Sequence, residues 1–363
     1  MKKALKFITG TLVLAYAAAL ICCAKEVGEA VVRSINVCIQ TIIPSLFAFM
    51  VISGFIISSN LYAVISLPFG AIARYIFRIP DKLFSVFLLS SAAGYPIGAK
   101  LLSDLYENGR TDKKTAEEML GYCYLGGPAF FCGTAGLKLY SRVKIGMIIF
   151  ICIFAANITI AVIMGFKRKN NAICQSCEPI KVTFCLTDLI NSINSGGAAL
   201  LKICAAIVFF SSFIAILDKT GILTAAAVFF SKLSGLSYEN CTAILRSMLE
   251  ISNISFIQPD IQLLPIVTAL LSFGGLCVII QVEGVLNGRF LTNIFYLSRI
   301  ISMILSYIYC KILIYAIDVN KIIQTDCNVQ SSLRHNSPIP SLFLLIMTIL
   351  LLSKNFIVKS KKM

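Results

Sequence analysis

Histidine and charged residues are scarce in this chain, and each shortage excludes a class of function. Only 13% of its 363 residues are charged, whereas soluble globular domains carry about 25%, so the polar side chains that would cover a soluble particle are lacking. The one histidine, His335, lies in a polar stretch, which argues against histidine-based catalytic triads and multi-histidine metal sites. A Gly-x-x-x-x-Gly-Lys-Ser/Thr phosphate loop is also missing. We therefore expect no enzyme, no cofactor and no metal site.

The fourteen cysteines do not read as a disulfide framework. Most lie inside apolar segments, where cysteine behaves as a small hydrophobe. Cys174 and Cys177 form a lone CxxC pair in a polar stretch, and without a second pair this spacing only weakly indicates metal or redox chemistry.

Apolar sequence dominates the chain. Hydrophobic residues make up 58% of it, and the mean hydropathy is +0.87. Four apolar runs have about the length that crosses the hydrocarbon core of a bilayer, roughly 20 residues, or slightly less. These runs cover residues 5–24, 145–166, 198–217 and 338–352. The sequence therefore predicts an integral membrane protein whose partner is the lipid bilayer.

The first apolar run could be mistaken for a signal peptide, because Lys2 and Lys3 precede it and Lys6 lies at its start. It ends without a clear small-x-small cleavage site and further apolar runs follow, so we expect a retained first helix. The formal net charge of +15 comes from lysines and arginines that lie mostly between or beside apolar runs, as in cytoplasmic loops and snorkelling helix ends. We expect no nucleic-acid partner, and a homo-oligomer stays open.

The order of segments predicts five parts. They are an N-terminal transmembrane helix (1–26), a first repeat (27–166), a basic linker loop (167–181), a second repeat (182–317), and a polar loop with a C-terminal transmembrane helix and basic tail (318–363). Each repeat reads as an amphipathic stretch, a span and two broken apolar segments, a plan typical of repeat-built transporters. The amphipathic stretches cover residues 26–41 and about 182–195, and the first of them, which carries Arg33, suits a helix that lies at the membrane interface. A shift of 148 positions aligns Gly126 and Gly127 with Gly274 and Gly275.

The strongest functional signal is a break in the apolar segment at 83–105. Its Gly94-Tyr95-Pro96-Ile97-Gly98 sequence combines glycines, which loosen the backbone, with a proline, which has no N–H and disfavours helix before it. Such a break at membrane depth is tolerated where the backbone is buried in protein or lines a polar cavity. Helix N-termini and the nearby Lys100 would suit an anion there. The alternative is a proline-kinked structural helix with Lys100 snorkelling to the interface.

A second break follows at Gly126, Gly127 and Pro128. Two neighbouring breaks predict paired re-entrant hairpins rather than two accidental kinks. In the second half, Ser252 and Asn253, and then residues 258–260 and 274–275, occupy comparable places.

Glu250 and Glu283 lie within apolar segments, where an ionisable group is costly and is a functional candidate by default. Glu250 could instead pair with Arg246, four residues earlier on the same helix. Glu283 has no partner next to it, but Arg289 is close enough for an interfacial position. Arg299, within the span at 291–317, is expected to be an interface or interhelix partner.

Several motifs occur in the order found in one family. They are Ile-Pro-Ser-Leu-Phe at 43–47, Gly-Tyr-Pro-Ile-Gly-Ala-Lys at 94–100, Asn-Gly-Arg-Thr at 108–111, Gly-Pro-Ala-Phe at 127–130, and Phe-Gly-Gly at 273–275 with Gln281. Over roughly residues 27–315 the chain resembles the YlbJ family of sporulation integral membrane proteins, which carry the nucleoside-recognition Gate domain. The resemblance implies a polytopic protein distantly like the concentrative nucleoside transporters. It also implies a link to endospore formation and to passage of dipicolinic acid into the developing spore.

We thus expect an all-α polytopic membrane protein of two related, inverted halves with re-entrant broken-helix hairpins. Its expected function is secondary or facilitated transport of a small organic solute, an anion such as dipicolinic acid during sporulation. The expected location is the bacterial cytoplasmic membrane, or the outer forespore membrane if the sporulation role holds. The alternative is a non-transporting assembly or scaffold protein of the spore envelope. The expected substrate-binding residues are Gly94, Tyr95, Pro96, Gly98, Lys100, Gly127, Pro128, Glu250, Ser252, Asn253, Gln281 and Glu283.

Overall fold

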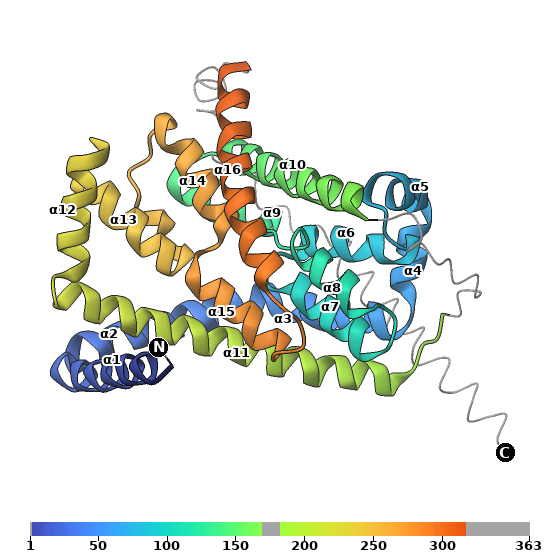
Figure 1. The fold of residues 1–363 in the computed structure, drawn as a ribbon, viewed down its shortest axis with the longest axis horizontal. Coiled ribbons are helices and arrows are strands. Elements are labelled where there is room, and N and C mark those ends of the chain that lie inside the picture. Colours follow the sequence, from blue (N-terminus) through green and yellow to red (C-terminus); the bar gives the residue numbers. More distant parts are fainter. Residues whose placement is uncertain (1, 169–181, 317–363) are drawn as a thin grey trace.

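The computed structural model describes residues 2–168 and 182–316, and within these ranges every regular element is a helix (Figure 1). The all-helical prediction is confirmed for this part of the chain. Most of the predicted linker loop, the polar loop after 317, the C-terminal helix and the basic tail lie outside the described residues.

The described ranges contain four to six candidate membrane spans, identified by their length and apolar composition. Four helical stretches are long and apolar enough to cross a bilayer: Val143–Lys167 (α10), Leu186–Lys219 (α11), Ile261–Leu286 and Asn293–Ala316 (α16). Two further pairs are sharply bent, Phe7–Cys22 with Ala24–Ile42 by 91° and Leu46–Ser58 with Leu61–Phe77 by 89°. Each bent pair is a broken span or a re-entrant loop.

Helix α11, from the second half of the sequence, lies against two helices of the first half. It packs against α2 (Ala24–Val37) and α3 (Ile43–Ser58), which a π-helical turn, η1 (Cys38–Ile42), joins into one helical stretch. Sequence patterning predicted an amphipathic stretch at 182–195 separate from the span at 198–217. The two form one helix instead, because Gly196 and Gly197 at their boundary stay helical and Gly196 lies against Met50 and Val51 of α3.

The predicted helix breaks are present in both halves. In the first half α6 (Phe84–Ala93) is separated from α7 (Ile97–Glu107), and α8 (Lys113–Leu120) from α9 (Pro128–Phe130), which continues into η5 (Phe131–Leu139). In the second half α13 (Tyr238–Leu249) is separated from η7 (Ile251–Phe256), and α14 (Leu264–Phe273) from α15 (Gly275–Leu286). The last break lies inside one candidate span, so Gly274 interrupts that helix without bending it away.

The two halves present their elements in a similar order. A long helical stretch, α2 to α3 or α11, is followed by a short helix, α4 (Leu61–Ser66) or α12 (Ile222–Ser234), then by two broken pairs and a long apolar helix, α10 or α16. The long apolar helices pack against each other. The division into two inverted repeats stays a prediction. The remaining described elements are α1 (Lys2–Cys22), η2 (Leu67–Phe69), α5 (Gly70–Ile72), η3 (Ala73–Phe77), η4 (Asp81–Leu83) and η8 (Ile261–Leu263).

Candidate functional site

The two breaks of the first half are in direct backbone contact. Gly94 ends α6 with a φ of +90°, and a Cβ atom added there would lie 2.7 Å from the amide nitrogen of Gly127. At Gly98, on the first turn of α7, an added Cβ would lie only 1.9 Å from the carbonyl oxygen of Cys123. Both positions therefore require glycine, since a side chain would push the two segments apart.

Two tyrosines connect these breaks to the second half. The rings of Tyr95 and Tyr124 stack with centroids 5.0 Å apart and planes 22° apart. The Tyr124 hydroxyl donates a hydrogen bond to the carbonyl oxygen of Phe273, 3.1 Å away, at the end of α14. The next residue, Gly274, has a φ of +82°, and an added Cβ would lie 2.1 Å from the Tyr124 hydroxyl oxygen.

The fourth break completes the cluster. A Cβ added to Gly275 would lie 3.0 Å from the carbonyl oxygen of Ser247 and 3.3 Å from the amide nitrogen of Ile251, on either side of the α13–η7 break. The breaks at 94–96, 121–127, 250 and 274 thus meet in one region, which we call the break cluster. The sequence predicted the breaks but not the role of Tyr124, although an aromatic residue two positions before a Gly-Gly-Pro break was a visible signal.

Arg299 of α16 forms hydrogen bonds with backbone carbonyl groups of the break cluster. Its side chain is 1% exposed, donates to the carbonyl oxygens of Gly121 and Tyr124, and lies 4.5 Å over the Tyr124 ring. The amide of Asn157 donates to the same Tyr124 carbonyl at 3.0 Å. A helix that stops leaves its last carbonyls without partners, and these side chains supply donors for them. Arg299 is therefore an interhelix partner rather than an interface residue, and these were the two roles expected from the sequence.

Lys100 does not snorkel to an interface. It is 3% exposed and forms an ion pair with Asp104, one turn further along α7, at 2.6 Å. Its ammonium group also reaches the Ser195 hydroxyl of α11 at 3.4 Å. A buried cation is tolerated when it is paired and hydrogen-bonded, and Asp104 compensates this one. Whether Lys100 also attracts substrate stays a prediction.

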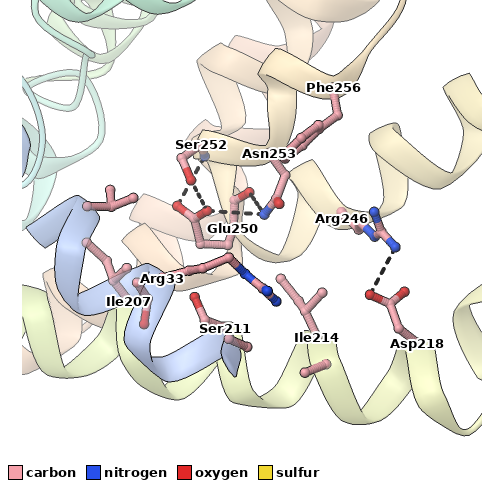
Figure 2. A pocket seen from close by; sticks show the side chains of 14 residues that line it. Arg33, Ile207, Ser211, Ile214, Asp218, Arg246, Glu250, Ser252, Asn253 and Phe256 are labelled. Carbon is pink, nitrogen blue, oxygen red and sulfur yellow. Dashed lines mark hydrogen bonds and ion pairs between the residues drawn. The ribbon is translucent and has the colours of Figure 1, made fainter. Parts of the chain in front are cut away.

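A cavity of about 420 Å³ lies beside the third break. Helices α2, α11 and α13 and the 3-10 helix η7 form its walls (Figure 2). Its charged lining groups are Arg33, Asp218, Arg246 and Glu250, and its uncharged polar groups are Ser34, Ser211, Ser252 and Asn253. Sequence reasoning named the three polar residues from 250 to 253 but missed the α2 and α11 walls, since the amphipathic pattern of α2 pointed to the membrane interface.

Glu250 is 6% exposed and does not pair with Arg246. Helix α13 ends at Leu249, and Glu250 adopts an extended conformation with φ −140° and ψ 115°. The carboxylate therefore leaves the helix face that carries Arg246 and accepts hydrogen bonds from the Ser252 amide at 3.1 Å, the Ser252 hydroxyl and the Asn253 side chain at 3.1 Å. Arg246 instead forms an ion pair with Asp218 of α11 at 3.0 Å, as Figure 2 shows. Among the described residues no lysine or arginine forms an ion pair with Glu250.

The remaining expected site residues lie apart from the cavity lining. Gln281 is buried on α15, where its amide donates to the Cys277 sulfur at 3.3 Å. Glu283 accepts a hydrogen bond from the Tyr296 hydroxyl of α16 rather than pairing with Arg289, whose partner is Glu107. Gly127 and Pro128 begin α9 within the break cluster. In the described part of the chain no group of three histidine, cysteine, aspartate or glutamate residues could hold a metal ion.

Comparison with known proteins identifies a distant relative. The chain is 23% identical over 302 residues to the sporulation integral membrane protein YlbJ of Bacillus subtilis (strain 168). This alignment covers 76% of this chain and 73% of the relative. No family model matches the chain, and no solved structure matches it. The chain is therefore an integral membrane protein distantly homologous to a bacterial sporulation membrane protein.

Proposed function

We propose that this distant homologue of YlbJ is a secondary or facilitated transporter of a small organic anion. The sporulation relative and the family resemblance make dipicolinate the first candidate substrate, carried across the outer forespore membrane. The bent and broken helices enter the bilayer as re-entrant hairpins, and the two halves are related by inverted repetition.

The observation that carries the proposal is the meeting of four helix breaks next to a polar cavity. In a bilayer, interrupted backbone is tolerated only where protein or a water-filled cavity satisfies it. Transporters use such discontinuous helices at the interface between repeats to form their substrate sites. Here breaks from both halves touch through Tyr124 and Phe273, and the third break carries three of the polar groups that line the cavity.

The chemistry of the cavity supports a small anion. Its volume of about 420 Å³ falls in the range of small-molecule sites, roughly 300 to 1,000 Å³. Arg33 extends from α2 toward the space below Glu250 and Asn253 (Figure 2). Its side chain is 70% exposed and forms a long ion pair, 3.8 Å, with the exposed Glu29 one turn earlier on α2. An arginine at the mouth attracts anions from solution, and its planar fork matches a carboxylate with two parallel hydrogen bonds. The Ser211 hydroxyl adds a further polar group to the lining, and the hydroxyl of Ser252 and the amide of Asn253 donate to Glu250.

The rival function is a non-transporting scaffold of the spore envelope. A scaffold needs polar residues at lateral interfaces with its partners, whereas in this chain four charged and four uncharged polar side chains converge on one cavity between α2, α11 and the third break. Convergence favours transport.

Uptake into proteoliposomes tests the proposal. Purified full-length protein is reconstituted, and entry of labelled dipicolinate is compared for the wild type, Arg33→Gln and Lys232→Gln. Lys232 lies on α12 and does not line the cavity, so its variant controls for lost surface charge. We expect uptake by the wild type and the Lys232 variant and at least a tenfold loss for Arg33→Gln. Vesicles that take up no more dipicolinate or other small carboxylate than protein-free vesicles would contradict the proposal.

A further inference from the structure

We infer that the Glu250 carboxyl group takes up a proton when an anion binds in the cavity, so that the cavity holds one anion together with one proton. The inference rests on the proposed function and names the ion that accompanies its substrate. Arg33 then holds the anion at the mouth, and the neutral Glu250 no longer repels it.

The first argument is the isolation of the Glu250 carboxylate from cations. Its hydrogen-bond donors are the amide and hydroxyl of Ser252 and the side chain of Asn253, all uncharged. Arg246, the cation placed to pair with it, is held by Asp218. Burying a carboxylate without a cation is costly, so the neutral form of such a group is favoured. Glu250 is therefore the acid in the cavity that can change its charge when its surroundings change.

The second argument is the charge of the cavity. Two arginines, Arg33 and Arg246, face two carboxylates, Asp218 and Glu250, so the lining has no net charge when all four are ionised. Glu29 of α2 pairs with Arg33 at 3.8 Å from outside the lining, and its side chain is 57% exposed, so solvent screens its charge. An anion entering this lining meets the negative charge of Glu250 without a cation to offset it. Protonation of Glu250 removes that repulsion and leaves one positive charge in excess. Anion binding and protonation of Glu250 therefore favour each other.

The third argument is that each of the other charged groups in the lining has a partner of opposite charge. Arg246 and Asp218 form an ion pair at 3.0 Å, and Arg33 pairs with Glu29 at 3.8 Å. Two thiols and one phenol interact electrostatically with Glu250: Cys38 of η1, Cys277 of α15 and Tyr95 of the first break. Groups of these types lose their protons only above about pH 8. The element η5, which packs against η7, contributes Cys132, Lys138 and Tyr140, and none of these lines the cavity.

The proton balance is simple. The Glu250 carboxylate accepts one proton from water on the side from which the anion enters, and it returns that proton when the anion leaves. No bond other than the O–H bond forms or breaks. Transport of the anion is then driven by a pH difference across the membrane as well as by the anion gradient.

Calorimetric titration of the full-length protein in detergent measures the linkage directly. Dipicolinate and the monocarboxylate pyridine-2-carboxylate are titrated between about pH 6 and pH 8.5, where the carboxyl groups of both free probes are ionised. Each titration is repeated in two buffers of different ionisation enthalpy, which reveals the number of protons taken up. For the wild type we expect about one proton per anion and an affinity that falls up to tenfold per pH unit. Glu250→Gln should bind without proton uptake and without this pH dependence.

Glu239→Gln is the matched control. Glu239 lies on α13, the helix that ends just before Glu250, accepts a hydrogen bond from the Gln258 side chain and does not line the cavity. Its variant should therefore bind like the wild type. Wild-type binding without proton uptake overturns the inference even if Glu250→Gln fails to fold. Proton uptake that persists in Glu250→Gln also overturns it.

The same measurements separate this inference from the proposed function. Binding with proton uptake but no uptake into vesicles contradicts transport and leaves the protonation of Glu250 standing. Transport without proton uptake contradicts the inference alone. A wild-type protein that binds neither probe contradicts both.

Discussion

Tyr124 donates its hydroxyl hydrogen to the carbonyl oxygen of Phe273 at 3.1 Å, and this bond joins a helix break of the first half to one of the second. The same ring stacks on Tyr95 and lies beneath the guanidinium of Arg299. One side chain thus contacts the first break, the fourth break and the helix that supports them.

Replacing Tyr124 with phenylalanine removes this bond and keeps the ring stack. The Phe273 carbonyl loses a donor in a buried place, which costs about 1 to 3 kcal/mol. We expect a clearly lower midpoint of thermal unfolding in detergent. Tyr75→Phe, at an exposed position, should leave the midpoint unchanged, and equal midpoints for both variants would speak against a structural role of the Tyr124 bond.

Alanine at Gly98 should disrupt the contact between the first two breaks. The added methyl group would lie 1.9 Å from the Cys123 carbonyl oxygen, so α7 must move away from the segment before Gly126. We expect little folded protein by size-exclusion chromatography. Gly28→Ala is the control, because Gly28 lies within α2 and an added Cβ meets nothing within 4 Å; alanine there should stabilise the helix by about 0.5 to 1 kcal/mol. Normal folding of Gly98→Ala would mean that the two breaks are not in contact.

Methionine at Arg299 should destabilise the break cluster. The carbonyl of Gly121 loses its guanidinium donor, whereas that of Tyr124 keeps Asn157. We expect a loss of about 2 to 4 kcal/mol, in the range for an unsatisfied buried group together with lost packing. Thermal unfolding provides the measurement, and Arg299→Lys should lose less because an ammonium group can still reach one carbonyl. A lysine variant as unstable as the methionine variant would contradict this account.

The ion pair of the buried Lys100 and the half-buried Asp104 should show strong coupling. Asp104→Leu leaves the Lys100 charge buried without its partner, at a cost of about 3 to 5 kcal/mol, and Lys100→Met, which leaves the more exposed Asp104, should cost less. The double variant removes both charges, so it should recover much of that loss. A double-mutant cycle of unfolding free energies tests this, and additive losses would show that the two charges do not interact.

The helix breaks and some of the spans could be predicted from the sequence, because they depend on the properties of the residues at those positions. Gly94, Pro96, Gly127 and Gly274 interrupt helices because of their own backbone properties, so their positions could be predicted without knowledge of the fold. The long apolar runs at 145–166 and 198–217 likewise predicted two of the candidate spans, α10 and α11, whereas the run at 5–24 belongs to a bent pair and that at 338–352 lies outside the described residues.

Partners across the fold were not predictable in the same way. Arg246 and Glu250 have the spacing of a helical ion pair, but the helix ends between them and Asp218 on α11 takes the arginine. Arg33 was assigned to the interface because an amphipathic pattern does not show that another helix and a break form a cavity beside it. The end of a helix and the choice between partners both depend on packing that no local pattern contains.

Exchange of solute across the bilayer tests the central claim most directly. Proteoliposomes are loaded with unlabelled dipicolinate, and entry of labelled dipicolinate is followed with and without this internal pool. A transporter with one cavity that opens to either side predicts faster entry with the pool present, and Arg33→Gln should abolish the acceleration while Lys232→Gln keeps it. Entry no faster than in protein-free vesicles, with or without the pool, would contradict the claim that this protein moves small anions.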